Sequence, residues 1–187
     1  MSLTIKIKIG SNVYNVSNDV VVNTIEIGAR ADFSFEVGSF KMYTSQITKN
    51  IPPYSICQIV DDNGTKYYLI SSESTAYFTQ SKWVHDCSLL SLEAILECFI
   101  VGAKTYSFIN TSSDVNVLGY SISLVNQSAG REIITLTSYE ELYDFHNEYT
   151  FPDGTSLYTI IKEICNKNNL KFRVRYSGNF NTDAPVY

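Results

Sequence analysis

The sequence is poor in the residues that usually carry catalysis or metal binding. It has two histidines and four cysteines, and no two cysteines form a Cys-x-x-Cys pair. This spacing excludes a paired-cysteine zinc motif, and a chain of 187 residues can bury a core without a disulfide framework. We therefore expect reduced, buried thiols at Cys57, Cys87, Cys98 and Cys165.

Long apolar runs are also missing. Residues 1–10 alternate between polar and apolar, and residues 89–103 are interrupted by Glu93 and Glu97. The first pattern is not that of a secretory signal peptide, and the second segment is too short and too charged to cross a bilayer. We expect synthesis in the cytoplasm and no membrane partner.

Positive charge is scarce, with 14 Lys and Arg against 19 Asp and Glu and a net charge of −5. A nucleic-acid surface needs clustered positive charge, so nucleic acid is not expected as the main partner. The sequence also lacks a P-loop, a dinucleotide fingerprint and a Gly-x-Ser-x-Gly elbow. These absences predict a protein without enzymatic activity and without a cofactor.

Aromatic residues are abundant, since fourteen Tyr and ten Phe bring the aromatic share to 13%. Such side chains favour β-strands. Residues 3–9 alternate and predict a strand with Thr4, Lys6 and Lys8 on a solvent face. Asn63 and Gly64, between two β-prone runs, predict a hairpin with a type I′ turn. The N-terminal part therefore predicts a small antiparallel barrel or sandwich.

Helical spacing of apolar residues predicts two helices. One covers about residues 88–101 and would close the open side of the barrel. The other covers about residues 156–168, is capped by Thr155 or Ser156, and leads into an alternating strand at 170–176. Between the helices, three shorter segments predict strands, at 106–109, 118–125 and 132–137.

The predicted fold class is therefore α+β and β-dominated, with two small antiparallel β-barrel-like or sandwich-like subdomains. The division is expected near residue 104, which gives domains 1–104 and 105–187.

Few residues qualify as site candidates. His85 and Cys87 would share one face of a strand, where they project in parallel and cannot align as a base and a nucleophile. No second ligand pair accompanies them, so a zinc site is not supported and His85 is interpreted as a hydrogen-bonded structural residue.

Two acidic segments are further candidates. Asp144, His146 and Glu148 alternate and could bind a metal weakly, although a solvated acidic face is the simpler interpretation. Residues 61–64 resemble the start of a calcium loop, but the later Glu is missing, so they are interpreted as a turn. We assign no catalytic, cofactor-binding or metal-binding residue from the sequence.

Aromatic residues around one hairpin leave a binding hypothesis open. Tyr67, Tyr68, Tyr77 and Phe78 could form a stacking platform for carbohydrate, as in a receptor-binding tip module. Packing in the core or in an interface explains the same residues more simply.

Three stretches, in this order, carry a resemblance to a known group. They are residues 31–37 followed by 56–62 and 67–70, the strand-to-helix stretch 83–93, and the capped helix and strand from 153 to 172. The chain resembles the N-terminal part of phage-tail baseplate hub proteins, the group that includes the late control gene D and tail-associated (Tal) hub families. Residues 105–150 show no clear match.

The resemblance implies a structural role in a virion tail that is made in the cytoplasm of a bacterial host. Two hub domains per subunit would form a homotrimer around the tail axis and join the tail tube to the tip. The expected neighbours are distal tail, tail tube or tape-measure proteins. The chain would be the N-terminal part of a longer protein, and in isolation it can be monomeric.

Exposed strand edges are the surfaces we expect to mediate self-association, at residues 3–9 and 170–176, because unpaired edges invite partner strands. A distal tail protein, which would assemble as a hexamer, is an alternative within the structural class.

Overall fold

The computed structural model describes most of the chain, namely residues 3–28, 35, 37–71, 74–101, 106–109, 117–135, 148–167 and 169–187. These residues form two compact units. The first comprises Met1–Ala94 and Gly178–Ala184, and the second comprises Ile95–Ser177 and Pro185–Tyr187. The α+β, β-dominated class predicted from the sequence is confirmed, whereas the hub domains 1–104 and 105–187 stay a prediction.

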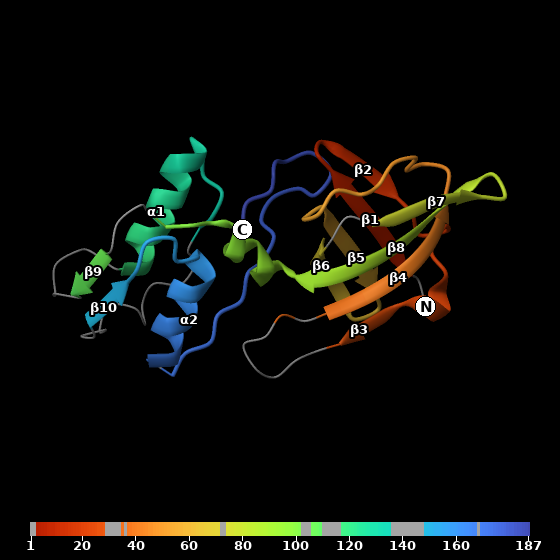
Figure 1. Cartoon of the computed structure of the whole chain (residues 1–187). Helices are drawn as coiled ribbons and strands as arrows, with labels where there is room; N and C mark the ends of the chain where they lie inside the picture. The colour runs from red at the N-terminus through yellow and green to blue at the C-terminus, as the bar shows by residue number, and fades with distance from the viewer. Residues whose placement is uncertain are drawn as a thin grey trace. The chain divides into compact units, whose positions relative to one another are not determined.

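The first unit is an eight-stranded antiparallel sheet (Figure 1). The strands run in the order β2-β1-β5-β6-β8-β4-β3, and β7 pairs with β8 off this path. Their bounds are β1 Thr4–Ile9, β2 Asn12–Asn15, β3 Glu26–Gly28, β4 Val37–Thr44, β5 Ile56–Asp61, β6 Gly64–Ile70, β7 Thr75–Thr79 and β8 Lys82–Ser91. Within the described residues the pairing path does not close on itself, so the predicted barrel is corrected to an open sheet.

The core of the first unit lies on one face of this sheet. Alternate residues of β1 and β4 point into it, among them Ile5, Ile7, Phe40 and Met42, which are at most 2% exposed. This is the period-2 burial expected of a sheet with one covered face.

Lys8 departs from the predicted alternation. It was expected on the solvent face of its strand, but it is only 5% exposed. Its Nζ donates hydrogen bonds to the backbone carbonyls of Phe180 and Asp183, and it lies 5.6 Å from the centre of the Phe180 ring. Residues from the far end of the chain thus cover this part of β1, which strand periodicity does not reveal.

The predicted hairpin forms between β5 and β6, with its turn one residue earlier than expected. Asp61 pairs with Gly64, so Asp62 and Asn63 are the two turn residues. The N–H of Asn63 donates to Asp61 Oδ1 over 2.8 Å, and Gly64 takes the positive φ of +121°. A side-chain-supported turn therefore replaces the predicted type I′ turn.

The predicted helix at 88–101 is wrong in its first part. Strand β8 continues to Ser91, and only Leu92–Cys98 is helical, as the 3-10 helix η2. Leu89 and Leu90 pair with Gly38 and Val37 of β4 on one side and with β6 on the other. Pairing on both sides of the strand outweighs the helical spacing of the leucines.

The second unit contains the remaining elements. A two-stranded antiparallel sheet joins β9 (Tyr106–Ile109) to β10 (Glu148–Phe151), and two helices are present, α1 (Val117–Ala129) and α2 (Leu157–Lys167). The strand predicted at 118–125 is therefore wrong, because this segment is α1, and no strand covers 132–135. The described residues of this unit form no barrel or sandwich of the predicted kind.

Helix α2 matches its prediction to within one residue. Ser156 caps it, since its Oγ accepts the N–H of Thr159 over 3.2 Å. The apolar stripe is buried, and Asn169 ends the helix in a left-handed conformation with φ +55°. Residues 170–176 alternate in exposure as predicted, but they lie outside the assigned strands.

Candidate functional site

His85 and Cys87 lie on the core face of β8, as the alternation predicted, and both are buried. The ring of His85 bridges two neighbours: Nε2 lies 3.0 Å from the carbonyl oxygen of Ile47 and Nδ1 lies 3.1 Å from Ser74 Oγ. A carbonyl oxygen only accepts, so Nε2–H donates to Ile47 and Nδ1 accepts the hydroxyl of Ser74. Ser74 Oγ in turn accepts the N–H of Ile51 over 3.0 Å.

Burial decides the ionisation of both side chains. It lowers the pKa of His85 below its ordinary value, although the hydrogen bond to Ile47 acts in the opposite direction. It raises the pKa of the Cys87 thiol to about 12. The neutral imidazole is enclosed and, through Ile47 and Ser74, holds residues 47–51 against the sheet. The thiol of Cys87 is buried and protonated, so it is not an accessible nucleophile.

The acidic candidates are not assembled into a site by the described residues. Asp144 and His146 lie outside the described part of the chain, and Glu148 begins β10. Within the described part, no three or more His, Cys, Asp or Glu side chains are grouped to hold a metal. Likewise, no helix in that part is long and apolar enough to span a bilayer.

The four aromatic residues considered as a carbohydrate platform are placed apart, and packing explains two of them. Tyr68 is 2% exposed and belongs to the core, whereas Tyr67 packs against Phe180 with ring centres 5.8 Å apart. Tyr77 and Phe78 are exposed on a different strand, and as consecutive residues they point to opposite faces. The four rings therefore do not share one surface.

The predicted assembly edges are also placed differently. The segment 3–9 is not an edge, because β1 pairs with β2 on one side and with β5 on the other. Strands β2 and β3 end the pairing path, and β7 pairs with β8 off it. Strand β3 is three residues long, too short to offer much of a template for a partner strand.

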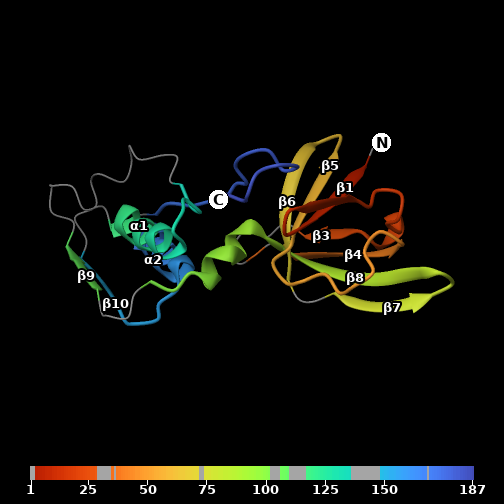
Figure 2. The same cartoon turned by 90° about the horizontal axis from the view of Figure 1, so that it is seen from above.

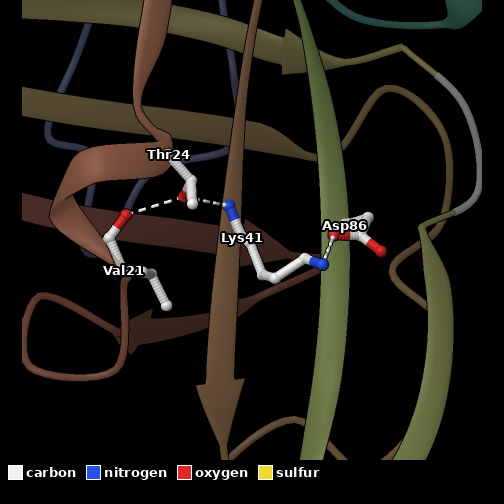
Figure 3. Close-up of polar contacts among 4 residues, drawn as sticks. All are labelled: Val21, Thr24, Lys41 and Asp86. Carbon is white, nitrogen blue, oxygen red and sulfur yellow. Dashed lines mark hydrogen bonds and ion pairs between the residues drawn. The ribbon is translucent and has the colours of Figure 1, made fainter.

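The outer edge of β4 beyond β3 is already occupied by the chain itself. The N–H of Val21 donates to the carbonyl of Lys41 over 2.9 Å, and the N–H of Lys41 donates to Thr24 Oγ1 over 2.9 Å. Thr24 Oγ1 donates onward to the carbonyl of Val21 over 2.7 Å, so the 3-10 helix η1 (Val22–Thr24) is fixed beside β4 (Figure 3). This edge is closed to a partner strand.

Strand β7 is the candidate interaction edge. Its five residues pair with residues 82–86 of β8, and they include no charge, proline or glycine. The resulting hairpin extends from the sheet in both views (Figures 1 and 2). Tyr77 is 46% and Phe78 61% exposed, and the Phe78 ring lies 5.5 Å from that of Trp83. Exposed edges usually carry charges or proline, so an unprotected aromatic edge marks a surface suited to a partner.

The turn of this hairpin is strained. Thr79 pairs with Lys82, and the two residues between them, Gln80 and Ser81, have φ of +45° and +68°. Two positive φ angles define a type I′ turn, which normally uses asparagine and glycine. The sequence carries no such signal here, which is why the β7–β8 hairpin was missed. Strain of this kind is frequent at functional sites.

The first unit is an open antiparallel sheet with a protruding hairpin, and the second is a small α+β unit. This combination has solved counterparts among phage tail proteins. The structure is similar to the 43 kDa tail protein of prophage MuSo2 from Shewanella oneidensis, with TM-score 0.53 and 13% identity over 89% of this chain and 51% of that one. It is also similar to prophage tail protein gp18 from Listeria monocytogenes EGD-e, with TM-score 0.53 and 9% identity over 88% and 45%.

A weaker likeness links the chain to a tail protein from Neisseria meningitidis MC58, with TM-score 0.46 and 10% identity over 90% of this chain and 46% of that one. The chain thus spans about half the length of these solved proteins. No family model and no curated protein matches the sequence. At these identities the comparisons establish the fold, which this chain shares with prophage tail proteins.

Proposed function

We propose that this chain is a structural component of a phage or prophage tail, and specifically of the baseplate hub. The observation that carries the proposal is the fold likeness, which covers 89% of the chain at TM-score 0.53 to a prophage tail protein. In this role the chain would self-associate as a trimer around the tail axis and join the tail tube to the tip. It would act through its surfaces and not as an enzyme.

The exposed edge of β7 supports a role in assembly. It is uncharged and carries the exposed ring of Phe78, so pairing with a strand of a neighbouring subunit would satisfy its backbone groups and cover this ring. Its partner would be a second copy of the chain or a neighbouring tail protein.

Electron microscopy of tail particles labelled with a gold-conjugated antibody against the chain tests the location. Label is expected where the tube meets the tip. Label along the whole tube, or absence of label from assembled tails, would contradict the proposal.

Light scattering on the protein across a range of concentrations tests the symmetry. A trimer supports the hub, and a hexamer supports a distal tail protein instead. A protein that stays monomeric both alone and in extracts of assembled tails contradicts both the hub and the distal tail protein.

A further inference from the structure

Strands β4, β8 and β7 present a second face, opposite to the core. Tyr43 of β4 and Tyr77 of β7 are both register partners of Val84 on β8. Cross-strand partners point to the same side of a sheet, so the three side chains form one row across it. Lys41 and Asp86 form the next row, because they are also partners and lie two residues along their strands.

Exposure differs along the first row. Val84 is 0% exposed although it lies on the face away from the core, whereas Tyr43 and Tyr77 are 37% and 46% exposed. The register places Tyr43 and Tyr77 on either side of Val84 on this face, so rings that lie along the sheet would account for the burial of the valine. The backbones that carry the two tyrosines are two strand spacings apart, about 9.5 Å.

Polar groups border this surface on one side. Lys41 Nζ lies 3.2 Å from Asp86 Oδ1, with side chains 35% and 49% exposed (Figure 3). The hydrogen bond to Asp86 raises the pKa of Lys41, and the two tyrosine hydroxyls contribute in the same direction. A donor and an acceptor are therefore held close to the tyrosines, and hydrogen bonds from the segment of η1 beside β4 fix the backbone of Lys41.

We propose that this face, formed by Tyr43, Tyr77, Lys41 and Asp86, binds a saccharide. Aromatic rings that lie flat can stack on the apolar face of a sugar ring, and a neighbouring ammonium–carboxylate pair can bond its hydroxyl groups. The two rings are spaced for a short run of linked sugars.

The size of the surface favours a saccharide over a protein partner. With about 200 Å² for a whole tyrosine side chain, the exposed fractions correspond to roughly 170 Å² of tyrosine surface, enough for a small ligand. A stable protein–protein interface buries about 800 Å² on each partner. The proposal does not rest on the hub assignment. It uses the sheet face that carries Tyr77, whereas the proposed assembly uses the backbone edge of β7 and the ring of Phe78, which points to the opposite face.

The test is binding of the intact chain to a printed array of bacterial surface glycans, followed by titration with chitotetraose, cellotetraose and any array hit while amide chemical shifts are recorded. Binding is expected to shift the amides of Lys41, Tyr43, Tyr77, Val84 and Asp86. Tyr77→Ala and Tyr43→Ala should each weaken binding about three- to tenfold, and Tyr77→Phe should keep most of it. Tyr120→Ala is the matched control, because Tyr120 is 40% exposed but lies on α1.

Three outcomes would overturn the proposal. One is the absence of binding to the array and to both tetrasaccharides at millimolar concentration. Another is binding that Tyr43→Ala and Tyr77→Ala leave unchanged. The third is a change of oligomeric state on Tyr43→Ala without glycan binding by the original chain, which would assign this face to a protein partner.

Discussion

At the scale of single residues, Lys8 shows how backbone carbonyls can hold a buried ammonium group. Its ammonium group is held by two backbone carbonyls and lies beside an aromatic ring. The neighbouring segment is itself ordered by Asp183, whose carboxylate accepts the N–H of Asn179 over 2.7 Å. That hydrogen bond is the largest cause of the lowered pKa of Asp183, and the hydrogen bond from the Thr182 hydroxyl is the second.

Replacement of Lys8 by methionine should destabilise the first unit. Two carbonyl groups lose their charged donor, and an unmet buried acceptor costs about 1 to 3 kcal/mol. Urea unfolding followed by the fluorescence of Trp83 measures this, because Trp83 is the single tryptophan and lies on β8. Lys66→Met, at an exposed position of β6, is the control; equal effects of the two changes would show that the bonds of Lys8 do not stabilise the fold.

His85 predicts a pH dependence of stability. Its pKa is lowered in the folded state, so below about pH 6.5 the unfolded chain binds a proton that the folded chain does not. Where the unfolded state binds more protons, stability rises with pH, so the free energy of unfolding should fall as pH is lowered from about 7 to about 5. The slope is at most about 1.4 kcal/mol per pH unit.

Comparison of the original chain with His85→Gln isolates this contribution. Urea unfolding at several pH values should show a weaker dependence for the variant, and His146 is present in both chains, so its effect cancels. Parallel pH curves would mean that His85 ionises equally well in the folded and unfolded states.

At the scale of elements, local chemistry made some segments predictable and left others open. Alternation located β1, and the Ser156 cap with its apolar stripe located α2. Residues 88–91 were misread as helix because their two strand neighbours come from distant parts of the chain. The site showed the same limit: alternation placed His85 and Cys87 on one face, but the edge status of β7 depends on long-range pairing.

The β7–β8 turn offers a test of stored strain. Gln80→Asn together with Ser81→Gly would install the residues that a type I′ turn favours. With the strain relieved, stability should rise by about 1 kcal/mol, which corresponds to roughly 2 to 4 °C in melting temperature for a chain of this size. Thermal unfolding followed by Trp83 fluorescence measures the change. A lower melting temperature would show that Gln80 and Ser81 make contacts that outweigh their strained backbone.

At the scale of the whole molecule, the proposed assembly depends on the edge of β7. Phe78→Lys places a charge on this edge, and it should weaken self-association about tenfold, or about 1.4 kcal/mol. Val22→Lys is the matched control, because Val22 is 67% exposed but lies on η1. Light scattering over a dilution series measures both. If the two variants dissociate at the same concentration as the original chain, β7 is not the assembly edge.

Residues Gly178–Ala184 belong to the first unit but follow residues Ile95–Ser177 of the second unit in the chain. The two acceptors of Lys8, the carbonyls of Phe180 and Asp183, are therefore synthesised only after all eight strands of the sheet. Until they are made, the sheet can form only with Lys8 uncovered and its ammonium group hydrated, although residues 95–177 of the second unit are already present. A chain shortened to end before residue 178 would keep every strand of the sheet but would lack the two carbonyl groups that bind Lys8.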